Sequence, residues 1–313
     1  MRGSSMASTS PWISAARFPR EVLITGMDRI ASMNIPEGTG MRMEWSLGRS
    51  FRLRRPHTEG RQFSLCTSTK GRLEARHLAT NWRQASSVEL VVAEFGPEPY
   101  LVFSPKYLPL VDCYVYAYCP WSSPFAPSWW KNVSAYASTG KIILQVDCDI
   151  AVNPSFYDWL QLSDGSTLWP DEISECPSFP YSPSKFEDLS MALGGVNYER
   201  VFCWHSSDMR RLGGWPEWYT GRLHTWILFR YQVSDLEIHK TCPANFFAHV
   251  PSLKVPGSSS DEKTRFPVSK PSCRSFWNLA EHGDPQPFNA EWPIPGWTPG
   301  SPSLYEEYLK SKP

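Results

Sequence analysis

Residues 63–93 alternate strand-like and helix-like patterns, and this alternation constrains the fold more than any other feature of the sequence. A short apolar run at residues 63–67 ends in a polar turn and is followed by a helical pattern over residues 73–84. A second apolar run covers residues 88–93. Strand, helix and strand in this order form a β-α-β unit with parallel strands and a right-handed crossover. The sequence therefore predicts an α/β fold with a mostly parallel central sheet flanked by helices.

Later segments extend this pattern toward the middle of the chain. A further hydrophobic segment covers residues 110–116, and we expect a helix from about residue 128 to 139. Gly140 follows this helix and is a good signal for its end. Another apolar run, residues 142–146, predicts a buried strand.

The two ends of the sequence lack this regular alternation. Residues 1–60 have an interrupted pattern, with short strands indicated at 21–24 and 43–47, and we expect them to form an irregular N-terminal extension. Residues 61–250 are then one α/β domain. The remaining residues, 251–313, begin with a polar loop and predict a loop-rich segment that packs on the domain.

Composition narrows the classes of function. Lys plus Arg and Asp plus Glu both total 31, and no long basic run is present, so we expect no nucleic-acid partner. The apolar stretches are much shorter than the roughly 20 residues of a membrane span, so no transmembrane segment is expected. The N-terminus lacks the apolar region of a secretory signal, and the 8 cysteines are scattered without metal-like spacing. Reduced thiols and a cytoplasmic location are the resulting predictions.

Two aspartates follow the strand predicted at residues 142–146. Asp147 and Asp149 are separated by one residue, so in extended geometry both side chains point to the same side. Adjacent carboxylates repel unless a cation joins them, and Mg²⁺ or Mn²⁺ commonly bridges carboxylates to substrate phosphates. The alternative is that Asp147 caps a turn and Asp149 begins a loop, since this spacing also arises by chance. Their position after a buried strand favours the metal site.

Five motifs resemble, in order and spacing, those of family-2-type glycosyltransferases with the GT-A fold, over about residues 62 to 250. They are residues 63–72, 91–96, 130–132, 144–149 and 211–215. The resemblance implies a domain that binds a nucleotide-sugar donor with Mn²⁺ or Mg²⁺. It also implies an enzyme that moves the sugar to a hydroxyl acceptor, which is a glycan, a lipid or a small molecule.

The resemblance further implies roles for individual side chains. Those matched to nucleotide-sugar binding are Thr67, Lys70, Arg72, Glu94, Lys131, Asn132 and Asp147. Asp147 and Asp149 match the metal-binding pair, and His249 matches a third metal ligand that some relatives supply. As a lone histidine, His249 could equally be a satisfied core residue. Most relatives carry Asp where this chain has Glu94, which leaves the choice of nucleotide open.

The family pattern breaks after the pair Gly213-Gly214. Relatives place a carboxylate there as the general base, whereas residues 220–230 contain none. Glu217 is the nearest acid and His224 the nearest imidazole, so either could reach an acceptor hydroxyl as the base. His224 could instead pack a helix against the sheet. Two functions follow: a metal-dependent glycosyltransferase, or an inactive relative that binds nucleotide sugars without the base.

Overall fold

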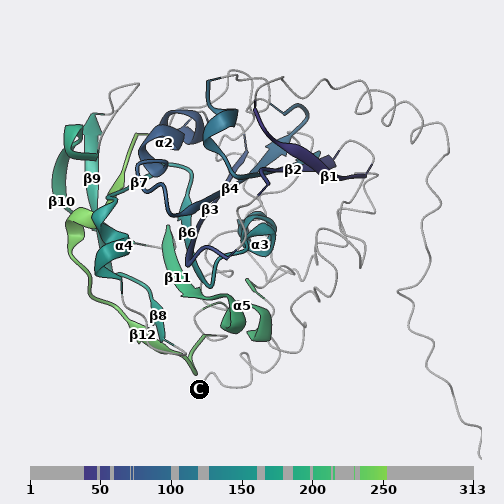
Figure 1. Cartoon of the computed structure of the whole chain (residues 1–313). Coiled ribbons are helices and arrows are strands. Elements are labelled where there is room, and N and C mark those ends of the chain that lie inside the picture. Colours follow the sequence, from purple (N-terminus) through teal and green to yellow (C-terminus); the bar gives the residue numbers. More distant parts are fainter. Residues whose placement is uncertain are drawn as a thin grey trace, which may run out of the picture.

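A computed structural model of the chain contains two β-sheets with helices on both faces of the larger one (Figure 1). The residues that it describes are 39–251, apart from 48–49, 57–59, 71, 73, 100–105, 119–126, 161–165, 179–185, 198–199, 213, 216–228 and 230–232. The strand expected at residues 21–24, both candidate bases and the C-terminal segment from residue 252 lie outside this part. Within it, no helix is both long and apolar enough to span a bilayer.

The larger sheet has nine strands in the order β1-β2-β5-β4-β3-β6-β11-β8-β12. In that order they cover Arg42–Leu47, Ser50–Arg54, Cys113–Tyr118, Glu89–Gly96, Phe63–Lys70, Ile142–Asp147, Val201–His205, Ser166–Leu168 and Glu237–His239. The four central strands, β5, β4, β3 and β6, run parallel, and β2 and β11 pair antiparallel on either side of them. The predicted α/β fold with a parallel sheet flanked by helices is confirmed, with antiparallel strands added on both sides of its centre.

Helices α2 (Glu74–Trp82) and α3 (Pro127–Ala137) cover opposite faces of the parallel strands (Figure 1). Because side chains alternate along a strand, Leu65 packs in the cluster that includes α2, whereas Cys66 packs in the cluster that includes α3. All eight residues of β4 are buried. Strands covered on both faces have continuous apolar runs, which explains why these segments were recognisable in the sequence.

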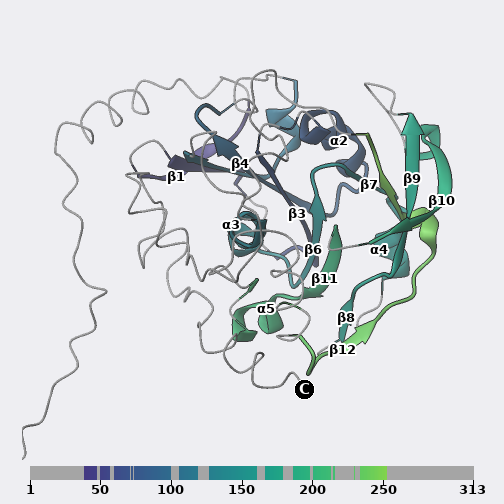
Figure 2. The same ribbon diagram turned by 180° about the vertical axis from the view of Figure 1, so that it is seen from behind.

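A second sheet of four strands stands beside the first, at the side away from β1 (Figure 2). Its order is β10-β9-β13-β7, and these strands cover Ser190–Val196, Glu172–Ser178, Phe247–His249 and Ile150–Val152. The remaining elements are α4 (Ser155–Trp159), α5 (Ser206–Leu212), η1 (Leu108–Leu110), η2 (Phe186–Asp188) and η3 (Ala244–Phe246). Strand β7 begins directly after Asp149, and β13 ends at His249. The second sheet therefore holds both residues beside the larger sheet.

Strands β1 and β2 lie within the segment expected to be an irregular extension. Strand β1 coincides with the short strand indicated at residues 43–47, and β2 pairs with β5. Phe51 and Leu53 of β2 are buried in the core cluster on the α2 side. Strands β1 and β2 therefore form part of the central sheet.

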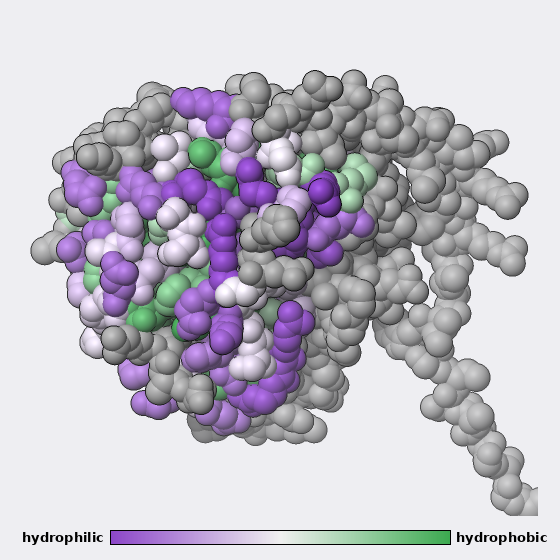
Figure 3. All heavy atoms as spheres, in the orientation of Figure 1, coloured by the Kyte–Doolittle hydropathy of each residue, from purple (hydrophilic) through white to green (hydrophobic). Residues whose placement is uncertain are grey.

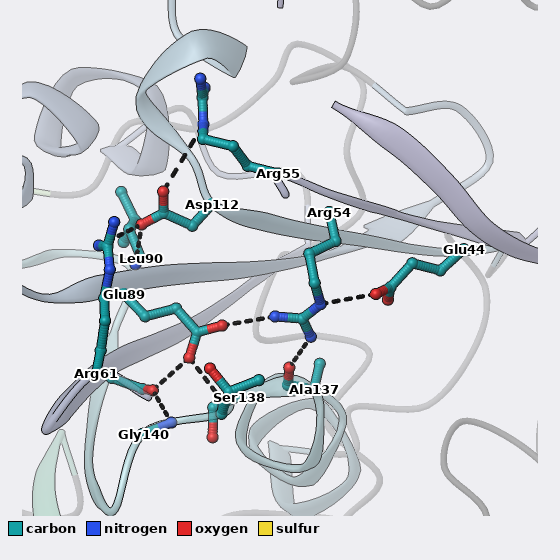
Figure 4. A network of polar contacts seen from close by, with 12 residues as sticks. Glu44, Arg54, Arg55, Arg61, Glu89, Leu90, Asp112, Ala137, Ser138 and Gly140 are labelled. Atoms are coloured by element: carbon teal, nitrogen blue, oxygen red, sulfur yellow. Dashed lines mark hydrogen bonds and ion pairs between the residues drawn. The ribbon is translucent and has the colours of Figure 1, made fainter. Parts of the chain in front are cut away.

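The amino ends of the parallel strands meet at a buried carboxylate, Glu89 (Figure 4). Arg54 donates a hydrogen bond to its Oε1 at 2.6 Å, and Ser64 Oγ and the Thr139 backbone N–H donate to its Oε2 at 2.5 and 2.7 Å. Ser64 Oγ also accepts a hydrogen bond from the Gly140 N–H at 2.8 Å. This network ties β2, β3 and β4 to the loop that follows α3.

A second buried carboxylate, Asp112, lies at the same end of the sheet. Its Oδ2 accepts hydrogen bonds from Arg83 at 2.6 Å, from Arg61 at 3.1 Å and from the Leu90 N–H at 2.9 Å. Its Oδ1 lies 3.8 Å from Arg55 Nε. Both oxygens of Asp112 thus face cationic partners.

The described surface is largely polar, and Figure 3 shows hydrophilic residues over much of one face. Among the described residues, the large hydrophobic side chains that are exposed are Met43 and Trp159. The described cysteines are free thiols.

Candidate functional site

Three parallel strands, β3, β4 and β6, end beside one another at the carboxyl edge of the sheet. Ser68 lies opposite Asp147 in the β3–β6 ladder, and Thr69 lies opposite Glu94 in the β3–β4 ladder. Lys70 is the last residue of β3. Ligands of open α/β sheets bind outside the carboxyl ends of the strands, so this edge is where a ligand is expected.

Asp147, the last residue of β6, forms an ion pair with Lys131 of α3. Lys131 Nζ lies 2.8 Å from Asp147 Oδ1, with 7% of the lysine side chain exposed against 34% of the aspartate side chain. The same ammonium group lies 5.0 Å from the centre of the Trp215 ring. A largely buried cation therefore stands beside a carboxylate that is still open to solvent, which is a suitable arrangement for an anionic ligand.

Asp149, in the turn between β6 and β7, is more deeply buried than Asp147. Its Oδ2 lies 3.4 Å from Arg72 Nη2 and 3.6 Å from His249 Nε2. Burial by itself raises the pKa of Asp149, but the hydrogen bond from His249 and the charge of Arg72 outweigh burial and lower it. Its Oδ1 is buried and has no hydrogen-bond partner among the described residues. A buried carboxylate oxygen without a protein partner has room to accept a hydrogen bond from a water or a ligand, or to bind a cation.

His249, at the end of β13, joins Asp149 to the second sheet. Its Nδ1 lies 2.6 Å from Glu175 Oε2, and Glu175 Oε1 accepts a hydrogen bond from Arg200 at 3.1 Å. Burial acts to lower the pKa of His249, but hydrogen bonds with Asp149 and Glu175 and the charge of Asp149 raise it overall. Burial likewise acts to raise the pKa of Glu175, and its bonds with His249 and Arg200 lower it. A chain of polar contacts thus runs from Arg72 through Asp149, His249 and Glu175 to Arg200.

Sequence reasoning did not find Glu175 or Arg200. Glu175 lies in strand β9 without a recognisable motif, and it meets His249 only because β9 and β13 pair in parallel. Arg200 precedes β11, and its carbonyl accepts a hydrogen bond from the Asp147 N–H at 2.8 Å. Pairings between distant segments leave no local signal, so these residues could be recognised only in the folded chain.

The acidic side chains at this edge are of the kind that binds a divalent cation. Asp147 and Asp149 offer carboxylate oxygens, which Mg²⁺ and Mn²⁺ prefer, and the unpartnered Oδ1 of Asp149 is such an oxygen. In the described part of the chain, no three His, Cys, Asp or Glu side chains are yet grouped closely enough to hold a metal ion. Lys131 and Arg72 stand beside the two carboxylates instead.

Asn132 of α3 holds the backbone at Gly214 and Trp215. Its Nδ2 donates to the Trp215 carbonyl at 2.8 Å, and its Oδ1 accepts from the Trp215 N–H at 2.7 Å. Gly214 has a φ of 74°, and a Cβ there would lie 2.9 Å from the Asn132 Cγ, so only glycine fits. Asn132 is 1% exposed, and it links α3 to this turn. Its proposed contact with the donor sugar stays a prediction.

The other residues matched to nucleotide binding differ in how far they are exposed to solvent. Thr67 and Glu94 are buried, and Glu94 Oε2 accepts a hydrogen bond from the Tyr114 hydroxyl at 2.5 Å. Lys70 is partly buried, with Nζ 5.7 Å from the centre of the Trp130 ring. The structure places these residues on the strands that form the carboxyl edge, and their roles toward a nucleotide stay predictions.

Glu217 and His224, the candidate bases, lie outside the described residues. Nothing in the described part places either of them relative to Asp147. Their role as a general base therefore remains an expectation from the sequence.

Comparison with known proteins gives matches only at the level of structure. No family model matches the chain, and no curated protein matches it. The solved structures that match include S. aureus TarS, with a TM-score of 0.43, 14% identity and 60% of each chain covered.

Two further structures that match belong to glycosyltransferases by name. The catalytic domain of Drosophila β1,4-galactosyltransferase 7 in complex with xylobiose has a TM-score of 0.37 and 14% identity, with 60% of this chain and 69% of that chain covered. The mannosyltransferase PcManGT from Pyrobaculum calidifontis, in complex with GDP-Man and Mn²⁺, has a TM-score of 0.39 and 11% identity, with 66% and 61% covered. The chain thus spans less than two thirds of TarS and of the mannosyltransferase.

Proposed function

We propose that this protein is a glycosyltransferase that moves a sugar from a nucleotide-diphosphate donor to a hydroxyl acceptor, with Mn²⁺ or Mg²⁺ as cofactor. One observation supports this most strongly. Asp147 and Asp149 lie beside Lys131 and Arg72 at the carboxyl edge of a parallel sheet, and Asp149 Oδ1 is buried without a partner in the described residues. Carboxylates and cations in such proximity suit a metal ion together with a diphosphate.

The charges of the site are balanced for this ligand. Two carboxylates now face two protein cations, and a divalent metal with a doubly charged diphosphate forms a neutral unit. Asp147 and Asp149 would turn to the metal, and Lys131 and Arg72 would turn to the phosphate oxygens, so no net charge would be added to a partly buried site. His249 would supply its Nε2 as a further ligand. When bound, the metal would offset charge on the leaving diphosphate.

Transfer also needs a base that takes the proton of the acceptor hydroxyl. Glu217 and His224 are our candidates, because residues 220–230 contain no carboxylate. Both follow the turn at Gly214, which Asn132 ties to the helix that carries Lys131. This connection through α3 supports an acceptor site next to the donor site.

The alternative function is binding of a nucleotide sugar without transfer. The missing carboxylate after the Gly-Gly turn favours this alternative, whereas the cation-paired aspartates fit both functions. The two functions share the donor site and differ only in the base.

An activity assay separates the enzyme from the binding protein. UDP-, GDP- and CDP-sugars would be incubated with the protein, Mn²⁺ and a panel of hydroxyl acceptors, and release of nucleoside diphosphate would be measured. We expect release that is lost with EDTA and in Asp147→Asn, and retained in the control Asp158→Asn, which alters an exposed carboxylate on α4. Binding of a donor with Mn²⁺ but no release with any acceptor would contradict the enzyme and leave the binding protein.

A further inference from the structure

His249 is held between two carboxylates, Glu175 on strand β9 and Asp149 in the turn between β6 and β7. In the parallel β13–β9 ladder His249 lies opposite Glu175, and in the antiparallel β13–β7 ladder it lies opposite Ile150. Its Nδ1 contacts Glu175 Oε2 at 2.6 Å, and its Nε2 faces Asp149 Oδ2 at 3.6 Å. The two ring nitrogens therefore have different partners and different distances.

Glu175 is itself held in place. Arg200 Nη1 donates a hydrogen bond to its Oε1 at 3.1 Å, which leaves Oε2 for His249. On the neighbouring strand β10, a Cβ at Gly195 would lie 2.9 Å from the Glu175 Cγ, so the glycine gives this side chain its space. The carbonyl of Arg200 also accepts the N–H of Asp147. Glu175 is thus connected to the same segment that positions the first aspartate.

The contact with Glu175 decides how the imidazole can be used. An ionised carboxylate only accepts hydrogen bonds, so Nδ1 must carry the hydrogen at this contact. When the ring is charged, Nε2 also carries a hydrogen that faces Asp149, and in the neutral ring this position is a lone pair that a metal can take. Histidines that bind metals commonly donate their other N–H to a carboxylate in this way, which fixes the tautomer and the ring orientation.

We propose that Glu175 is a positioning residue that holds His249 with Nε2 directed at the metal bound beside Asp149. This inference rests on the proposed metal-dependent function. Glu175 does not touch the metal in this account. It acts through His249, and Arg200 acts through Glu175.

The exposure of Glu175 separates this role from a contribution to folding. Its side chain is 42% exposed, and ion pairs of exposed side chains contribute little to stability. Replacing Glu175 should therefore change metal binding without a comparable change in the melting temperature. If Glu175 had a purely structural role, its replacement would instead lower the melting temperature without a comparable change in metal binding.

The test is a titration of the full chain with Mn²⁺ alone, followed by electron paramagnetic resonance of the free ion. We expect Glu175→Ala to weaken Mn²⁺ binding by about 10–100-fold. Glu175→Gln keeps an oxygen that accepts the Nδ1 hydrogen, so it should restore part of the affinity. Glu172→Gln, an exposed residue on the same strand, is the matched control and should bind Mn²⁺ as the wild type does.

Pulsed electron paramagnetic resonance at saturating Mn²⁺ adds a signal that stability does not affect. The wild type should show coupling to an imidazole nitrogen, His249→Ala should lose it, and Glu175→Ala should weaken it. If the wild type binds Mn²⁺ and Glu175→Ala binds it equally well, the positioning role is wrong while the metal site stands. If the wild type binds no Mn²⁺, the proposed metal-dependent function fails, and the inference fails with it.

Discussion

The carboxylates at the two ends of the parallel strands differ in how completely their oxygens are paired with donors or cations. At the amino end, both oxygens of the fully buried Glu89 accept hydrogen bonds, and both oxygens of Asp112 face arginines (Figure 4). At the carboxyl end, Asp149 Oδ1 is buried without a partner in the described residues, and Asp147 is 34% exposed. A buried charge is tolerated only when it is fully paired. The amino end is therefore built for stability, whereas the carboxyl end retains capacity for a ligand.

The largest effect should come from breaking the amino-end network. Arg54→Ala leaves Glu89 buried next to Ser64 without its cation, and we expect a loss of about 3–5 kcal/mol in the free energy of unfolding. Urea denaturation measures this loss. Arg42→Ala, which removes an exposed arginine from the neighbouring strand β1, should stay within about 0.5 kcal/mol of the wild type. Equal effects of the two substitutions would contradict the account of the amino end.

An intermediate effect is expected at the Gly-Gly turn. Gly60 and Gly214 both have positive φ values, 82° and 74°, but a Cβ at Gly60 would meet nothing within 4 Å. Gly60→Ala should cost about 1–2 kcal/mol through backbone strain alone. Gly214→Ala adds a collision with Asn132 and should cost more than Gly60→Ala in the same urea experiment. If the two losses are the same, Asn132 does not hold the turn as described.

The smallest effect on stability should come from the carboxyl end. Asp147→Asn removes the carboxylate charge but keeps an oxygen that accepts a hydrogen bond from Lys131, whose ammonium group also faces the Trp215 ring, so we expect the free energy of unfolding to fall by only about 1 kcal/mol. The same substitution should nevertheless abolish Mn²⁺-dependent donor binding. A loss of stability as large as that of Arg54→Ala would show that Asp147 serves the fold, and the contrast between the two ends would disappear.

Local patterns were sufficient to predict the parallel centre of the fold. Periodicity predicted the strands β3, β4 and β6 and the helices between them. The strands are recognisable because they are buried on both faces, and the helices because each buries one stripe of its surface. Asp147 and Asp149 were recognisable because they directly follow such a strand. Their contacts with Lys131 and Arg72 were not derivable from spacing.

What the sequence could not reveal depends on pairings between distant segments. Glu175 meets His249 because β9 and β13 pair in the second sheet, and Arg200, just before β11, contacts Glu175. Residues 1–60 were expected to form an irregular extension because their apolar pattern is interrupted, yet β1 and β2 complete one side of the sheet. In each case the partner strand, rather than the local sequence, determines the structure.

Metal-dependent binding of a nucleotide sugar is the most direct test of the carboxyl-end site. Thermal unfolding of the wild type and of Asp149→Asn would be measured with UDP-, GDP- and CDP-sugars, each with and without Mn²⁺. A ligand at about 100 times its Kd stabilises the folded state by about 2.7 kcal/mol. We predict such a shift for at least one donor, only with Mn²⁺ and only in the wild type. Absence of a shift with every donor, or an equal shift in Asp149→Asn, would contradict the site.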